Sequence, residues 1–211
     1  MLEFSKELFV VAEIDYWKSV LTGLVAPKIP ILRYVPQHRE PPPRIVTSPT
    51  AWKGIESILG DLIQRFQVGT HRCLEFGVEH GYSTVALSSF FDSVTGVDTF
   101  CGDIHTGNKN DIFAQTSQRL SGFDNIQLVR SDYRDWIAKD DTFYDLIHVD
   151  IVHTYVDTFA CGSWSAQHAS CILFHDTLSF PAVKRAVTDI ARETGKTFYN
   201  FEESYGLGIL V

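Results

Sequence analysis

Short apolar segments alternate with segments of helical periodicity over most of this 211-residue chain. Such apolar segments, bounded by polar residues, are typical of buried strands. Predicted strands lie at 72–78, 93–98, 125–131, 144–151 and 171–175, and predicted helices at 83–91, 111–120, 133–138, 154–166 and 181–194. This alternation predicts an α/β fold, in which helices cover both faces of a parallel sheet.

Two further strands are predicted near the C-terminus, in KTFYNFEES and YGLGILV. Right-handed crossovers bring the carboxyl ends of the parallel strands to one edge of the sheet. Ligands bind at that edge, near the point where the strand order reverses. We therefore expect the functional residues at the strand ends.

Charge and composition restrict the function. The chain has 26 acidic and 18 basic residues, and a net charge of −8 does not favour nucleic acid as a partner. No apolar run is long enough to span a membrane, and MLEFSKELF lacks the features of a signal peptide, so a cytoplasmic protein is expected. The four cysteines form no CxxC pair, which indicates small core residues in a reducing compartment rather than a zinc site.

The first 50 residues differ from the rest of the chain. Residues 4–24 have roughly helical spacing, whereas residues 26–50 contain seven of the eight prolines and an excess of basic residues. Proline fixes φ and removes a backbone donor, so this part is predicted to be extended or irregular. The proline-rich segment is either a solvated linker wrapped on the domain, or an arm that covers the active site or contacts a second subunit of a homo-oligomer. Residues 1–50 are therefore predicted as an N-terminal helix and a proline-rich arm. Residues 51–211 are predicted as the functional domain.

The turn after the first long strand reads LEFGVEHGYSTVAL, residues 74–87. Aligned on Gly77, it has Glu75 and His80 where the dinucleotide fingerprint G-x-G-x-x-G needs glycines. A carboxylate beside a pyrophosphate is unfavourable. S-adenosylmethionine (SAM) has no phosphate and carries an ammonium and a sulfonium, so it suits this turn better. Gly77 would let the backbone approach the ligand, and Gly81 would allow a tight entry into the helix.

Carboxylates also stand at the next two strand ends. Asp98 ends the second strand, where it could accept from both ribose hydroxyls, and Asp132 follows the third, where it could accept from the adenine amino group. Strand-end aspartates also serve as helix caps, but these elements in this order together predict a SAM site. The predicted cofactor contacts are Glu75, Gly77, Gly81, Tyr82, Ser83, Asp98, Asp132, Tyr133 and Asp150.

This stretch resembles the first motif of class I SAM-dependent methyltransferases, and GYST before a small apolar residue is typical of their O-methyltransferase branch. The resemblance covers about residues 51–211 and leaves the first 50 uncovered. It implies a Rossmann-like, doubly wound sheet of seven strands in the order 3-2-1-4-5-7-6, with an antiparallel last strand.

A second group of polar residues follows the fourth and fifth long strands, in DLIHVDIVHTYVDT and CILFHDT. Asp150 and Asp176 would end adjacent strands about 4.8 Å apart, close enough to share a hard cation such as Mg2+. The segments resemble a methyltransferase family with the motifs D-G-D-H-x-Y-E and F-H-D, some members of which methylate sugar hydroxyls of natural products. The resemblance implies Asp150, His175 and Asp176 as metal ligands. It also implies His153 as the base, with Asp150 beside it as the second catalytic residue.

The chain departs from that pattern at Ile151, Val152 and Val156, where the family has glycine, aspartate and glutamate. A site with two carboxylates binds metal less well than one with more. The same residues also have purely structural interpretations: Asp150 could cap the next helix, and His153 could be a satisfied histidine of its first turn.

The predicted function is SAM-dependent methyl transfer to a hydroxyl of a small-molecule acceptor, with SAM as the cofactor and Mg2+ as a candidate second cofactor. The proline-rich arm and the loop at 101–110 would close over the site, with His105 and Asn108 near the substrate. Two alternatives remain open: a SAM-binding protein without turnover, and a metal-dependent, hydroxylase-like enzyme on the same fold. An NAD dehydrogenase is disfavoured because the glycine fingerprint fails.

Overall fold

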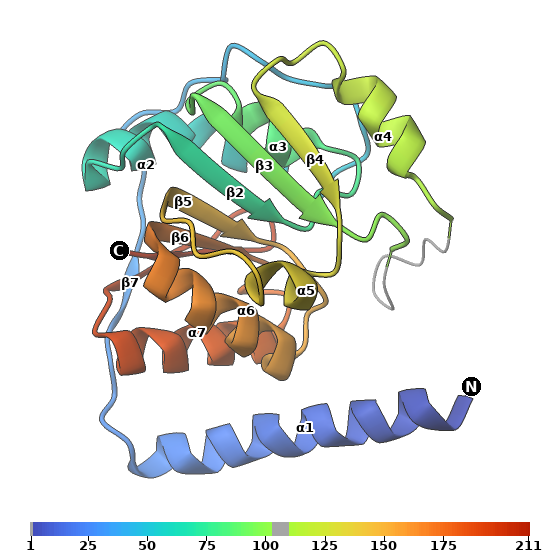
Figure 1. The fold of residues 1–211 in the computed structure, drawn as a ribbon. Helices are drawn as coiled ribbons and strands as arrows, with labels where there is room; N and C mark the ends of the chain where they lie inside the picture. The colour runs from blue at the N-terminus through green and yellow to red at the C-terminus, as the bar shows by residue number, and fades with distance from the viewer. Residues whose placement is uncertain (1, 103–109) are drawn as a thin grey trace.

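The computed structural model describes the backbone of residues 2–102 and 110–211, and the side chains of residues 14–102 and 110–211. Within that part, one sheet of eight strands has the order β1-β7-β8-β6-β5-β2-β3-β4 (Figure 1). The strands are β1 (Ile31–Arg33), β2 (Arg72–Phe76), β3 (Ser93–Asp98), β4 (Ile126–Arg130), β5 (Tyr144–Val149), β6 (Ala169–His175), β7 (Phe198–Phe201) and β8 (Leu207–Leu210). The helices are α1 (Leu2–Val25), the 3-10 helix η1 (Ile55–Ile58), α2 (Leu59–Phe66), α3 (Tyr82–Leu87), α4 (Phe113–Leu120), α5 (Tyr133–Ile137), α6 (Tyr155–His168) and α7 (Pro181–Thr194).

The predicted α/β fold is confirmed, with one strand added to the sheet. Counted from β2, the strands follow the order 3-2-1-4-5-7-6, and β8 runs antiparallel to both β6 and β7. The added strand, β1, comes from the proline-rich segment and pairs in parallel with the edge strand β7. A three-residue strand at an edge is compatible with prolines on either side, because proline can donate no hydrogen bond to a sheet.

Two apolar cores lie on opposite faces of the sheet. Along each strand the buried side chains alternate between them: Cys73 faces the core that contains α2 and α3, and Leu74 faces the core that contains α6 and α7. This is the period of two that a strand imposes on its side chains. Helix α1 lies outside α6 and α7, at the periphery of the molecule (Figure 1).

The carboxyl ends of four strands meet at one edge, as predicted. Beyond the strands the backbone pairing continues for one residue: the Gly77 N–H donates to the Val97 carbonyl (3.0 Å), and the Asp150 N–H donates to the Phe76 carbonyl (2.8 Å). These bonds place the turn after β2 beside the end of β5. The residues that follow the strands are therefore held against a rigid sheet.

The proline-rich segment lies against the domain. The buried Tyr34 hydroxyl donates to Asp61 at 2.5 Å, and Arg39 forms an ion pair with Glu203. The segment is thus held on the domain, which is compatible both with a linker wrapped on the domain and with an arm. No helix in the described part of the chain is long and apolar enough to cross a membrane. Three of the cysteines, Cys73, Cys161 and Cys171, are buried thiols, and the fourth, Cys101, is exposed.

Candidate active site

A cleft of about 260 Å3 opens at the carboxyl ends of β2 to β5. Six residues that the sequence predicts for the site line this cleft: Gly77, Asp98, Asp132, Tyr133, Asp150 and His153. They come from the turns after four different strands. The structure thus brings together most of the predicted cofactor contacts and both predicted catalytic residues.

A second cavity of about 300 Å3 adjoins the first. Its walls include Tyr82 and Ser83 at the start of α3, His175 and Asp176 after β6, and the end of the proline-rich segment at 49–52. Gly77, Glu79, Asp150 and His153 line both cavities. The two cavities therefore meet at the predicted catalytic residues. Tyr82 and Ser83, predicted as cofactor contacts, lie on the side of the second cavity.

The close contact between the β2 turn and the end of β5 requires glycine at position 77. Gly77 has a φ of 90°, and a Cβ atom there would collide with the carbonyl oxygen of Asp150. Gly81 also has a positive φ, 81°, where it begins α3 and packs against Leu120. Gly81 lines neither cavity, so its role in the structure is the helix entry alone.

Glu75 lies elsewhere than the sequence predicts. It is fully buried within β2, it lines neither cavity, and its carboxylate accepts hydrogen bonds from Thr84 and from His148 Nδ1 (2.8 Å). The Trp52 indole donates to the other ring nitrogen of His148, at 3.2 Å. An indole N–H can only donate, so His148 Nε2 accepts and Nδ1 carries the proton. Glu75 therefore holds the turn and the sheet together in a closed network instead of contacting the cleft.

Asp98 lies in the cleft, but much of its capacity to accept hydrogen bonds is used. One carboxylate oxygen accepts from the backbone N–H groups of Val78 and Glu79, both at 2.8 Å, and the other from that of Phe100 at 2.7 Å. An ionised carboxylate offers about four acceptor positions. Asp98 therefore has room for about one more donor. Glu79, which the sequence reasoning did not select, is a further carboxylate that lines the cleft.

Asp132 and Tyr133 have structural partners as well as a place in the cleft. Asp132 caps α5 by accepting from the Arg134 N–H at 2.8 Å, and it also pairs with the Arg134 guanidinium. The Tyr133 hydroxyl donates to the buried Asp157 at 2.7 Å. Burial and Asp157 both raise the pKa of Tyr133, so its hydroxyl stays protonated. Tyr133 therefore offers the cleft an aromatic wall.

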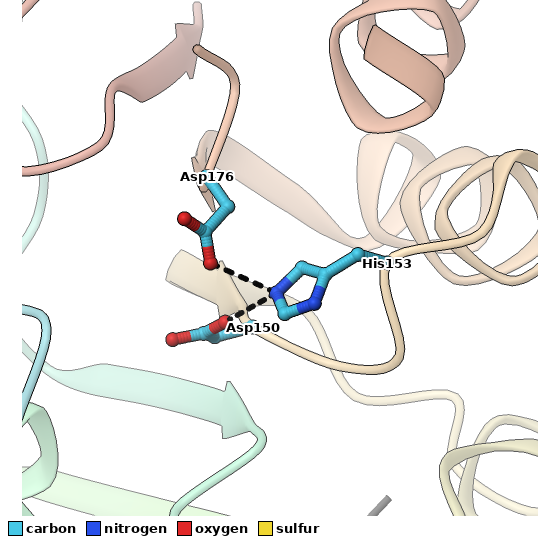
Figure 2. Close-up of side chains that lie close together, drawn as sticks. All are labelled: Asp150, His153 and Asp176. Atoms are coloured by element: carbon cyan, nitrogen blue, oxygen red, sulfur yellow. Dashed lines mark hydrogen bonds and ion pairs between the residues drawn. The ribbon is translucent and has the colours of Figure 1, made fainter. Parts of the chain in front are cut away.

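Two histidines and two aspartates converge where the cavities meet. His153 Nε2 lies 2.9 Å from Asp176 Oδ2 and 3.4 Å from Asp150 Oδ1 (Figure 2). His175 Nδ1 lies 3.2 Å from Asp150 Oδ2, and its Nε2 lies 3.1 Å from the Ser204 carbonyl oxygen. A carbonyl only accepts, so Nε2 of His175 carries a proton and Nδ1 faces the carboxylates.

The four side chains strongly shift one another's pKa values. Burial lowers the pKa of both histidines, but the two carboxylates outweigh it and raise the pKa to about 9 for His153 and about 10 for His175. Burial raises the pKa of both aspartates, but the histidines outweigh it. They lower the pKa of Asp176 to about 2 and hold that of Asp150 well below its usual range. Without a cation, protons on the histidines thus balance the two carboxylates.

This group has the donor atoms of a metal site. Asp150, His153 and Asp176 each offer a ligand atom, and these atoms lie within 4.8 Å of one another. The sequence predicts Asp150, Asp176 and His175 as ligands, whereas this set of three contains His153 in place of His175. Carboxylates suit Mg2+, whereas imidazole nitrogens suit zinc, iron and similar metals. The residues fit a divalent cation, and the mixed donor set extends the choice beyond Mg2+.

Several residues around the cavities have unusual backbone angles. Glu79, Phe100 and Asp176 are non-glycine residues with φ values of 48°, 58° and 65°. Such conformations cost energy and are concentrated at functional sites. A positive φ gives no strong signal in the sequence except through glycine, so these positions could not be recognised there. His105 and Asn108, predicted near the substrate, lie outside the described residues.

Residues 74–177 match the family model described as a methyltransferase domain. Over this segment, just under half of the chain, the sequence is similar to a methyltransferase domain. The segment contains the β2 turn, the described residues that line the cleft and all four converging side chains, and it ends one residue beyond Asp176. A search of curated protein sequences finds no match.

Solved methyltransferase structures share the fold. They include the O-methyltransferase of Bacillus cereus in complex with SAH (TM-score 0.53, 17% identity, 79% of this chain and 82% of that chain covered). TomG, an O-methyltransferase of Streptomyces achromogenes in complex with SAM, has a TM-score of 0.56 at 15% identity, with 80% and 82% covered. CalS10, an amino pentose methyltransferase of Micromonospora echinaspora, has a TM-score of 0.57 at 11% identity, with 76% and 91% covered. At these identities the likeness is one of fold.

Proposed function

We propose that this chain transfers a methyl group from SAM to a hydroxyl of a small-molecule acceptor. The observation that carries the proposal is the meeting of two cavities at Asp150 and His153. One cavity has the position of a cofactor cleft at the carboxyl edge of the sheet. The other opens beside it and would hold the acceptor.

The charges in the first cleft support SAM as the cofactor. Asp98, Asp132 and Glu79 line it, whereas Arg134, the one Lys or Arg among the described lining residues, is paired with Asp132 and Asp157. Carboxylates suit a ligand that carries positive charge and hydroxyl groups, and they repel a pyrophosphate. When bound, SAM would supply the methyl group on a positively charged sulfur. The solved structures of TomG with SAM and of the Bacillus cereus enzyme with SAH share the fold.

The side chains at the junction are suited to handle a proton. In the proposed mechanism Asp150 orients the acceptor hydroxyl. His153 first releases to solvent the proton that the carboxylates hold on it, then accepts the hydroxyl proton, and Asp176 stabilises the resulting imidazolium at 2.9 Å. Phe180 stacks on His153 with ring centroids 4.2 Å apart, which limits the orientation of the imidazole. Much of the rate would come from holding the oxygen in line with the methyl group.

Calorimetry with SAM tests the cofactor, and SAH release in the presence of hydroxylated acceptors tests the reaction. His153→Ala should bind SAM as the unaltered chain does and should lose turnover. His71→Ala is the matched control, because His71 also pairs with an aspartate, Asp92, but is exposed and far from both cavities. Unchanged turnover in His153→Ala would remove His153 as the base. SAM binding without SAH release from any acceptor would favour a binding protein.

A divalent cation is the second part of the proposal. Asp150 and Asp176, with one or both histidines, would hold it, and it would lower the pKa of a bound hydroxyl. At Nε2, His153 cannot be both a metal ligand and a base, so the two roles are alternatives. Metal analysis of His153→Ala separates them: retained metal with lost turnover supports the base, and lost metal supports the ligand.

The mixed donor set also favours one competing function. Two imidazoles and two carboxylates at one point resemble the ligands of redox-active iron as much as those of Mg2+. A metal-dependent, hydroxylase-like reaction on this fold is therefore the second candidate. Iron in the purified protein, together with the absence of SAM binding, would favour it. Mg2+ or no metal would count against it.

A further inference from the structure

Over its described side chains, helix α1 exposes a row of apolar residues. They are Ile14, Trp17, Leu21, Leu24 and Val25, of which Trp17 is 58% and Leu24 75% exposed, and the polar Lys18 and Thr22 are exposed beside them. The five apolar residues are among only thirteen large hydrophobic residues exposed in the whole described part of the chain. A helix on the surface of a monomer normally has the opposite arrangement.

Polar contacts fix the rotation of α1 against the domain. Ser19, the buried residue on the inward side, donates to Asp189 of α7 and accepts from Arg185 Nε at 2.6 Å. A Cβ atom at Gly23, one turn further along, would collide with the Arg185 guanidinium. The helix cannot turn its apolar side inward without breaking these contacts. Figure 1 shows no other element beyond α1 on its outer side.

We propose that this outward side of α1 pairs with α1 of a second copy of the chain, antiparallel, to form a two-fold symmetric dimer. Residues 14, 17, 21 and 24 follow the three- and four-residue spacing of a helix-pairing stripe. When two copies of α1 are aligned antiparallel and centred on residue 19, the apolar residues of one copy face those of the other. In the antiparallel register Trp17 meets Leu21 of the partner subunit, and Ile14 meets Leu24 of the partner subunit. A two-fold interface requires this reciprocity.

The apolar area suffices for a dimer and is large for a monomer. Side chains of this size expose on the order of 100 Å2 each when mostly free, so two copies of the stripe would bury about 1,000 Å2. A specific interface needs about that much, whereas the largest apolar patch of a typical monomer is about 300–600 Å2. Helix α1 lies far from the cleft, so the dimer is independent of the proposed reaction.

Sedimentation analysis of the full chain tests the pairing. The unaltered chain should form a dimer at micromolar concentration, and Trp17→Glu/Leu21→Glu should be a monomer with the same circular dichroism spectrum. The matched control is Phe143→Glu, which replaces an aromatic side chain of similar exposure, 59%, and should stay dimeric. A monomeric unaltered chain, or a dimer that survives both α1 substitutions, would overturn the proposal.

Cysteine cross-linking tests the antiparallel register without relying on destabilising charges. In a Cys101→Ser background, which removes the exposed thiol, Ile14→Cys and Leu24→Cys proteins should cross-link when mixed. Each alone should not, because its own symmetry mate lies about 15 Å away along the helix axis. Cross-linking of each protein alone, or none in the mixture, would overturn the register. Binding of a monomeric chain to phosphatidylcholine–phosphatidylserine vesicles, lost in Trp17→Glu/Leu21→Glu, would assign the surface to membranes instead.

Discussion

The molecule contains two groups in which a histidine meets a carboxylate, and they differ in what surrounds them. Glu75 and His148 lie within the neighbouring strands β2 and β5 and are fully buried. Thr84 and Trp52 complete their hydrogen bonds. The second group lies at the carboxyl ends of β5 and β6, where two cavities meet. It consists of Asp150, His153, His175 and Asp176. The first group is closed by the chain itself. The second has carboxylates and imidazoles that face space for a ligand.

This difference shows that residue type alone does not make a site. A closed network satisfies every polar atom internally, so it stabilises the fold and binds nothing. The open group keeps four titratable side chains within reach of one another, with pKa values displaced in opposite directions. Displaced pKa values in a cleft are typical of functional sites. The two groups should therefore respond differently to substitution.

The largest effect is expected in the open group. Asp150→Asn keeps the shape of the side chain but removes the charge that faces His153 and His175. We expect a loss of turnover of about 10²–10⁴-fold, the usual contribution of acid–base groups, with SAM affinity changed less. SAH release measures it. Asp141→Asn, at an exposed position beyond the site, is the control. If Asp150→Asn keeps full turnover, the contrast between the two groups fails.

The closed group should affect stability instead. Glu75→Ala leaves the buried His148 and Thr84 without their acceptor, which should lower the free energy of unfolding by about 2–4 kcal/mol. Urea denaturation measures it. SAM affinity per folded molecule, from calorimetry, should be almost unchanged, because Glu75 lines neither cavity. A large loss of SAM affinity in the conservative Glu75→Gln variant would restore Glu75 as a cofactor contact.

A smaller effect is expected at Trp52, which connects the two groups. Its indole donates to His148, and its ring lines the second cavity. Trp52→Phe keeps an aromatic ring but removes the donor, so we expect a loss of about 1 kcal/mol in unfolding free energy. Denaturation of Trp52→Phe/Glu75→Gln, compared with the two single variants, should reveal coupling. Additive losses would mean that the four residues do not form one network.

The smallest effect concerns Asp61, a third carboxylate, which holds the proline-rich segment. Burial raises the pKa of Asp61, but hydrogen bonds from Tyr34, His38 and Gln37 outweigh it and lower the pKa below its usual value. A lowered folded pKa contributes stability above the unfolded pKa, and this stability is lost as pH falls through the folded pKa. Asp61→Asn should therefore lose stability at neutral pH and show a weaker decline below about pH 4. Unfolding curves across that range measure it, and parallel declines would contradict the assignment.

The sequence predicted the fold better than the roles of single residues. Hydrophobic periodicity located the long strands because it reports directly which side chains are buried. Their order in the sheet was implied by the resemblance to class I methyltransferases. The periodicity missed β1, whose three residues lie among prolines and pair only because β7 leaves an edge open. Gly77 was predicted to let the backbone approach the ligand, and in the structure it allows the close approach of the turn to the Asp150 carbonyl. Glu75 was predicted to contact the ligand, but both faces of β2 are covered and its carboxylate is buried against Thr84 and His148.

The sequence by itself determined the α/β layers and brought the polar residues of the strand ends to one edge, because burial periods and right-handed crossovers are local properties of the chain. The tertiary structure alone decided which of those residues face a cavity. It joined His153 to Asp176 from a different strand end, and it closed Glu75 with Thr84, His148 and Trp52. Hydrogen-bond partners that lie many residues apart depend on packing, which no local pattern records.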